Sequence, residues 1–243
     1  MSGKFGSWLF GKWGPLEKSL INWTKDVLFP EDALCCACGR AADEGGLCAA
    51  CRESLLHDGA FFAWSRSDPA PDLPAWSLRP HDGVPRELVI RLKYGAEARA
   101  ARLLAELLLP LPADVSFPPD TVVTWVTMPE SRRRERAIDH GRLLAETFAE
   151  KLDLPCRRLL ARRDRREKRQ ATLSARQRSA NLSGAFTPLE AISFPVLIID
   201  DVRTTGTTLC RVADALRAGG AEQVFALTVT AADNRLFSRD RRF

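Results

Sequence analysis

The sequence predicts an α/β protein with a parallel sheet, helices on both faces of that sheet, and a small N-terminal zinc-ribbon module. Three observations support this prediction. Short aliphatic segments alternate with longer segments of helical periodicity, as in βαβ folds. One of the aliphatic runs, Val196–Ile199, is apolar on both sides, which is typical of a strand buried in a parallel sheet. Two Cys-x-x-Cys pairs precede the alternating segments.

Length and composition set the general class. A chain of 243 residues buries one good core with a small additional module. No segment is an uninterrupted apolar stretch long enough to span a membrane, and lysines interrupt the apolar residues of the first 30, so no signal peptide is expected. We therefore expect a cytoplasmic protein. Because that compartment is reducing, its paired cysteines indicate a metal site before a disulfide.

Residues 1–30 are expected to form an amphipathic arm. Aromatic and aliphatic residues alternate with lysines there, and their spacing is broadly helical from Leu16 onward. Packing on the body of the protein or on a partner is the favoured interpretation. A helix lying on a membrane surface is the alternative.

The next segment, 31–60, is predicted to be a zinc-finger module. Its two knuckles, separated by nine residues, offer four thiolates, the soft tetrahedral ligand set that Zn²⁺ prefers. The expected ligands are Cys35, Cys38, Cys48 and Cys51. Cys36 is a spare thiol, because only Cys35 has the required spacing to Cys38.

The main domain is expected over 84–243, after a linker at 61–83 that contains a short strand near Trp76–Arg79. Helices are predicted first, one on each side of Gly95, and strands and helices then alternate. The predicted helices are 84–94, 96–109, 141–152 and 207–218. Besides Val196–Ile199, the predicted strands are 121–128 and 223–230.

The stretch after Val196–Ile199 has the composition of a site for a phosphorylated sugar. Asp200 and Asp201 stand where the strand is expected to end, and such carboxylates accept hydrogen bonds from ribose hydroxyls or hold Mg²⁺ through water. A hydroxyl-rich turn and a helix follow, and this combination suits a phosphate group. The phosphate-binding residues expected there are Thr204, Thr205, Gly206, Thr207 and Thr208. A strand that ends in a self-capped polar turn is the alternative.

Positive charge is concentrated in two windows. Between Arg157 and Arg178 there are ten basic and two acidic residues, a net +8, although the whole chain carries only +5. A second window adds four arginines against two glutamates between Glu130 and Arg136. Such local charge indicates an anionic ligand nearby. The candidate anion-binding residues of the second window are Arg132, Arg133, Arg134 and Arg136.

The Asp200–Thr208 stretch resembles the phosphoribosyl pyrophosphate (PRPP) signature of type I phosphoribosyltransferases. The order of motifs along the chain is similar to that of the ComF family, which joins a zinc finger to a phosphoribosyltransferase-like domain. Besides the cysteine knuckles and the PRPP signature, the matching motifs are Leu92-Lys93-Tyr94-Gly95, the Arg132–Arg136 loop with its following helix, and Gln170-x-x-Leu173-Ser174 with Arg178-x-x-Asn181. Together they cover most of residues 31–232.

This resemblance implies a site for PRPP with Mg²⁺, in addition to structural zinc. Asp200 and Asp201 would hold the ribose, the following turn the 5′-phosphate, and arginines the pyrophosphate. The chain departs from the family where Arg136-Ala137-Ile138-Asp139-His140 replaces the usual Arg-Gly-Phe-Asn-Gln. Thr204 also stands where purine-salvage enzymes of this fold carry an Asp.

Two functions follow from the resemblance. The first is a PRPP-binding phosphoribosyltransferase-like protein that supports DNA uptake or processing in natural transformation, with an unknown acceptor if it is an enzyme. The second is a non-catalytic protein that binds single-stranded nucleic acid and keeps the PRPP pocket as a regulatory site. Expected partners are PRPP, single-stranded DNA and other DNA-uptake proteins.

Overall fold

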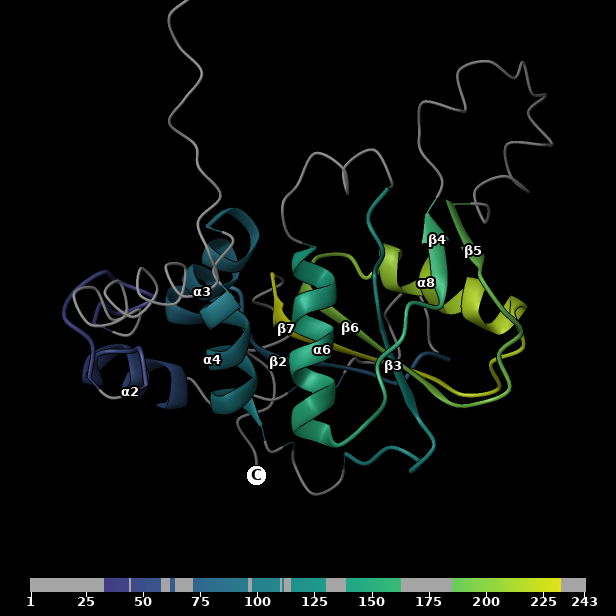
Figure 1. The fold of residues 1–243 in the computed structure, drawn as a ribbon, viewed down its shortest axis with the longest axis horizontal. Helices are drawn as coiled ribbons and strands as arrows, with labels where there is room; N and C mark the ends of the chain where they lie inside the picture. Colours follow the sequence, from purple (N-terminus) through teal and green to yellow (C-terminus); the bar gives the residue numbers. More distant parts are fainter. Residues whose placement is uncertain are drawn as a thin grey trace, which may run out of the picture.

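A five-stranded sheet forms the centre of the protein, with strand order β1-β2-β7-β6-β3 (Figure 1). Only β1 is antiparallel to its neighbour, and the other four strands run parallel. A second sheet contains β4 and β5 alone. The strands are β1 (Phe62–Ala63), β2 (Ala75–Pro80), β3 (Val122–Trp125), β4 (Leu160–Arg162), β5 (Phe186–Pro188), β6 (Val196–Arg203) and β7 (Val224–Ala231). The helices are α2 (Ala49–His57), α3 (Gly83–Tyr94), α4 (Ala98–Leu108), α6 (His140–Leu152) and α8 (Thr207–Ala218).

This computed structural model describes residues 33–43, 45–57, 62–63, 72–95, 98–109, 111, 115–129, 139–162 and 185–232. The predicted N-terminal arm 1–30, the arginine loop 132–136 and most of the basic window 157–178 lie outside these ranges. Within them, no helix has the length and apolar character that crossing a membrane requires.

Helices cover both faces of the sheet because the inner strands are apolar on both sides. Along β6, Leu197 and Ile199 point into a core shared with α2, α3, α4 and α6, whereas Val196 and Ile198 point into a core shared with α8. This alternation is the two-residue period of a strand buried on both faces. The predicted fold class is therefore confirmed.

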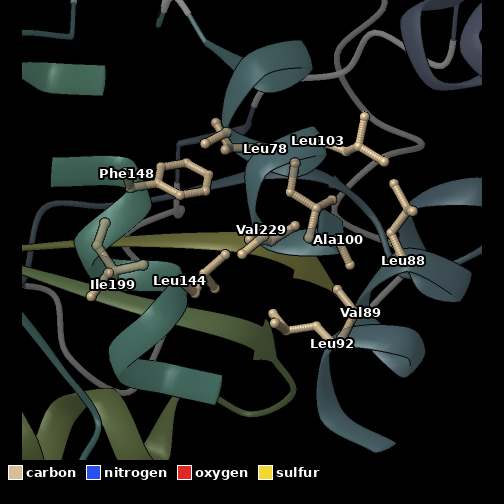
Figure 2. Close-up of a cluster of buried hydrophobic side chains, with 14 of the residues drawn as sticks. Leu78, Leu88, Val89, Leu92, Ala100, Leu103, Leu144, Phe148, Ile199 and Val229 are labelled. Carbon is tan, nitrogen blue, oxygen red and sulfur yellow. The ribbon is translucent and has the colours of Figure 1, made fainter. Parts of the chain in front are cut away.

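Leu144 and Phe148 anchor the larger core from helix α6 (Figure 2). Both side chains are fully buried, and α6 packs against β3 and β6 of the sheet and against α4. The cysteine knuckles belong to the same core, since Cys35, Leu47 and Leu55 are buried in it with the residues of α3. The N-terminal module therefore packs as part of one continuous hydrophobic core.

Most predicted elements are present. Helix α8 has the predicted bounds, and α3 ends at Tyr94, where Gly95 caps it. Strand β3 is shorter than the predicted 121–128, because pairing with β6 stops at Trp125. The short strand expected inside the linker is β2, which pairs with β7 in the main sheet.

The predicted end of the strand, just before the acidic pair, was wrong. Asp200 and Asp201 do not follow β6 but lie inside it, and the strand continues to Arg203. The reason is the partner strand: Val202 pairs with Thr230 and Arg203 with Ala231 of β7. Backbone pairing therefore holds Asp200 and Asp201 in extended conformation, so their side chains point to opposite faces of the sheet.

Replacing Phe148 by Ala tests how far the larger core supports the fold. The side chain is fully buried, so its loss should leave a cavity that lowers the free energy of unfolding by about 3–5 kcal/mol. Phe148→Leu retains most of the volume and should cost clearly less. Urea unfolding of both variants is the measurement, and equal stability of Phe148→Ala and wild type would contradict the assigned packing.

Candidate functional site

A polar cavity of about 270 Å³ lies at the carboxyl edge of the sheet, beside β3 and β6. In open α/β sheets this edge is where ligands bind. The walls come from the end of α3, the segment after β3, the start of α6 and the end of β4, and β6 contributes the acidic pair. The lining residues are Lys93, Tyr94, Val126, Met128, Pro129, Asp139, His140, Gly141, Arg162, Asp200 and Asp201.

Asp201 connects two basic side chains at this cavity. Its Oδ1 lies 2.8 Å from Nζ of Lys93, and its Oδ2 lies 3.6 Å from Nε2 of His140. The Asp201 side chain is only 9% exposed, so the Lys93 ammonium compensates a carboxylate that is largely removed from water. The strand thus brings its second carboxylate between the last turn of α3 and the first turn of α6.

Asp200 lies next to Asp201 on the strand but has a different environment. Burial, with the neighbouring Asp201 charge, raises the pKa of the Asp200 carboxyl to about 8. The Asp201 backbone N–H donates a hydrogen bond of 3.0 Å to Oδ1 of Asp200, which opposes that shift. Asp200 therefore retains its proton to a higher pH than an ordinary aspartate does.

The hydroxyl-rich turn after β6 leads into α8, as predicted. Gly206 is the N-cap of the helix with φ of 72°, a backbone conformation that favours glycine. Thr205 Oγ1 lies 2.9 Å from Thr207 Oγ1, and the threonines of the turn are exposed. None of Thr204–Thr208 lines the 270 Å³ cavity, so the predicted site has two parts, the turn and the cavity, adjoining the same strand.

Of the anion-binding residues, the arginines at 132, 133, 134 and 136 lie outside the described residues. The described cavity instead presents Lys93, His140 and Arg162, none of which was predicted as a site residue. Arg162 lies over the ring of Phe186, with Cζ 5.3 Å from the ring centroid. Lys93 could have been predicted as a site residue from its place in the motif Leu92-Lys93-Tyr94-Gly95.

Helix α6 begins at His140, in the stretch 136–140 where the sequence differs from the Arg-Gly-Phe-Asn-Gln of the ComF family. Asp139 is its N-cap and accepts a hydrogen bond from the Arg142 backbone N–H, which an Asn in the same place would also do. His140 is the first residue of the helix and lies between this cap and Asp201. The altered pair therefore lies at the cavity and adds one carboxylate and one imidazole to its lining.

The four predicted metal ligands come together in the N-terminal module. The Sγ atoms of Cys35, Cys38, Cys48 and Cys51 all lie within 4.8 Å of one another. Cys38 and Cys48, from different knuckles, have Sγ atoms 3.7 Å apart. A tetrahedron with metal–sulfur bonds of about 2.3 Å has edges of about 3.8 Å, so these thiols fit a zinc ion. Cys36 is not part of the group.

Arg40 lies against the two more exposed thiols of this group. Its Nε donates to Cys38 Sγ at 3.4 Å, and its Nη2 donates to Cys48 Sγ at 3.9 Å. The guanidinium lowers the pKa of the Cys38 thiol to about 6, which favours the thiolate form that binds metal. The other two thiols, Cys35 and Cys51, are buried.

The chain is similar to several known proteins. Residues 139–240 match the phosphoribosyl transferase domain family. The chain is 26% identical to competence protein F of Haemophilus influenzae, over 84% of this chain and 93% of that protein. Among solved structures, it resembles orotate phosphoribosyltransferase of Mycobacterium tuberculosis with 17% identity, 75% of each chain covered and a TM-score of 0.33.

A second relative is more similar in sequence. The chain is 30% identical to the DNA utilization protein YhgH of Salmonella typhimurium, and the match covers 79% of this chain and 87% of that protein. The chain contains the four clustered cysteines ahead of the domain that carries the acidic pair. On these grounds the chain belongs to the ComF family of phosphoribosyltransferase-like proteins.

Proposed function

We propose that this protein binds PRPP at the carboxyl edge of its sheet, as a phosphoribosyltransferase-like protein that supports the uptake or processing of DNA. The observation that carries the proposal is strand β6: its Asp200 and Asp201 line a polar cavity that also contains Lys93 and Arg162, and its end leads into the exposed hydroxyl turn of α8. PRPP has the complementary sequence of groups: a phosphate, a ribose with two free hydroxyls, and a pyrophosphate.

Each part of the ligand has a proposed position. The 5′-phosphate accepts hydrogen bonds from the turn at 204–208, where the start of α8 favours an anion. The ribose hydroxyls donate to Asp200 and Asp201. The pyrophosphate lies among the cations of the cavity, Lys93 and Arg162, and the arginines of the loop 132–136 add to them.

The chemistry that this arrangement favours is transfer of the ribose 5-phosphate group. The transition state carries positive charge on the ribose ring while negative charge moves to the departing pyrophosphate. Mg²⁺, which arrives with PRPP, would neutralise that leaving group. The protein's own contribution is orientation: the turn and the acidic pair hold the ribose while Lys93 and Arg162 hold the leaving group.

The alternative is a protein that binds PRPP without turnover and acts on single-stranded nucleic acid. The names of both relatives refer to competence or DNA use, and the sequence has a net charge of +8 between Arg157 and Arg178. Release of pyrophosphate from PRPP distinguishes the two functions. A role in DNA uptake, with other uptake proteins as partners, is compatible with both.

The cysteine group is proposed to hold one structural zinc ion in the module 31–60. Four thiolates suit Zn²⁺, and a reducing compartment, the cytoplasm, would keep them available. Zinc would then stabilise the module by joining its two knuckles.

We expect the purified protein to contain one zinc ion per chain. Cys48→Ser removes one of four thiolates and should abolish stoichiometric metal, whereas Cys36→Ser should retain it because Cys36 is outside the group. Metal analysis of the undenatured protein is the measurement. A zinc content well below one per chain, with four freely titrating thiols, would refute the site.

Asp201→Asn should weaken PRPP binding by at least about tenfold, since hydrogen bonds to charged groups contribute about 1.5–3 kcal/mol. Asp200→Asn should have a smaller effect, because burial favours the protonated form of Asp200 and Asn resembles that neutral acid. Asp214→Asn, on the exposed side of α8, is the matched control. Calorimetry in the presence of Mg²⁺ measures all three, and unchanged affinity in Asp201→Asn would exclude the proposed ribose site.

Single-stranded DNA should bind the full chain with an affinity that falls as salt rises, by about 0.7 log units per log unit of salt for each phosphate contact. Replacing Arg163, Arg165 and Arg166 by Glu should weaken this binding and give a shallower salt slope, while PRPP affinity stays unchanged. An unchanged DNA affinity would exclude the window as a nucleic-acid contact. Loss of PRPP affinity alone would instead indicate a lid over the PRPP site.

A further inference from the structure

Tyr94 ends helix α3 and is 76% exposed, the largest exposed fraction among the bulky hydrophobic side chains of the described residues. It is also one of the residues that line the cavity. The helix end that carries it is fixed, because Leu92 is buried in the larger core and the Gly95 backbone N–H donates to the Arg91 carbonyl at 2.9 Å. An aromatic ring is therefore presented to solvent at the edge of a polar cavity.

The cavity lining has a charged part and an apolar part. The charged part suits the phosphates and hydroxyls of PRPP, which the proposed function assigns to it. PRPP has no apolar group, so it does not account for the apolar part. Ligand sites commonly combine a few polar groups with apolar and aromatic walls that contact a ring or chain. The apolar lining residues are Tyr94, Val126, Met128 and Pro129.

The topology of the sheet separates Tyr94 from Arg162, a cation proposed to hold the pyrophosphate. Helix α3 contacts β2 and β7, on one side of β6. On the other side, β3 pairs with β6, and the segment that leads to β4 runs along β3 through the bridge of Val123 with Cys156. Arg162 is the last residue of β4. Tyr94 and Arg162 therefore approach the acidic pair of β6 from opposite sides (Figure 1).

These two positions suit an acceptor and a leaving group. In a displacement at C1′ of PRPP, the acceptor attacks the face of the ribose opposite the departing pyrophosphate. With the pyrophosphate toward Arg162, that face lies toward Tyr94. Tyr94 also follows Lys93, whose Nζ lies 2.8 Å from the Asp201 carboxylate that is proposed to hold the ribose. A ring attached at C1′ would therefore be a neighbour of Tyr94.

We propose that Tyr94 stacks against a planar heteroaromatic ring, such as a nucleobase, and that this ring is the acceptor of the ribosyl group. This inference rests on the proposed function. A ring nitrogen forms a bond to C1′ with its lone pair, the bond between C1′ and the pyrophosphate oxygen breaks, and pyrophosphate leaves with that electron pair. The proton of the ring nitrogen is released to water. Stacking on an aromatic side chain tolerates different bases, because every base has a π-face.

Nucleoside 5′-monophosphates test the ring subsite without turnover, because they add a base to the groups of ribose 5-phosphate. Calorimetry on the full chain, purified with its metal, should show that AMP, GMP, CMP or UMP binds at least about fivefold more tightly than ribose 5-phosphate, the lower end of what base–aromatic stacking contributes. Tyr94→Ala should remove this gain, and Tyr94→Phe should keep it. Ribose 5-phosphate should bind wild type and both variants equally.

The acceptor role has its own readout, which is the release of pyrophosphate from PRPP with Mg²⁺. The free base whose nucleotide shows the largest gain should accelerate this release in wild type, and Tyr94→Ala should lower the base-dependent rate at a fixed, low base concentration by at least about fivefold. Leu56→Ala is the matched control, since Leu56 is 51% exposed on α2 and does not line the cavity. It should retain both the gain and the rate.

The outcomes separate this inference from the proposed function. Equal binding of the nucleotides and ribose 5-phosphate by wild type, an undiminished gain in Tyr94→Ala, or a gain without base-dependent pyrophosphate release would overturn the inference. A short oligothymidylate distinguishes the source of the ring: if Tyr94→Ala weakens only its binding, the ring belongs to a DNA strand and the acceptor role is wrong. Failure of wild type to bind PRPP would overturn the proposed function as well.

Discussion

The parallel pairing of β6 with β7 is the constraint on which the rest of the site depends. The pairing continues through Arg203, so both carboxylates of the acidic pair are held in extended backbone. Successive side chains of a strand point to opposite faces. Asp201 therefore faces Lys93 and His140, and Asp200 occupies the desolvated position beside it. If the strand ended at Ile199, as its aliphatic run indicates, strand pairing would not determine the direction of either Asp side chain.

This alternation also divides the chemistry of the site. Two chemically identical side chains, one residue apart, differ in their surroundings: Asp201 pairs with Lys93, whereas burial raises the pKa of Asp200. The difference comes from their neighbours: Lys93 of α3 contacts Asp201 directly, whereas at Asp200 the effect of burial on the pKa outweighs the opposing charges of Lys93 and Arg162. A pair of this kind can accept hydrogen bonds at one position and donate one at the other.

Sequence periodicity predicted the fold well where segments are long and regular. Helix α8 has its predicted limits because Gly206 and Gly219–Gly220 interrupt the helical pattern at both ends. The cysteine spacing likewise predicted the four-thiol group. Local patterns could not reveal the strand β2 as part of the main sheet, because its partner β7 is about 150 residues away in sequence. For the same reason Lys93 and Arg162, which reach the cavity from α3 and β4, were not among the predicted site residues.

The shared core of the cysteine knuckles and α3 has a thermodynamic consequence. Leu47 and Leu55 of the N-terminal module and Leu88 and Leu92 of α3 are all fully buried in one cluster. Any ligand that binds only the folded knuckles stabilises whatever unfolds together with them. Because α3 ends at the cavity with Lys93 and Tyr94, occupancy of the thiol site and the population of an intact cavity are linked quantities. A metal ion bound by the thiols would therefore also favour the folded state of α3, whose last residues line the cavity.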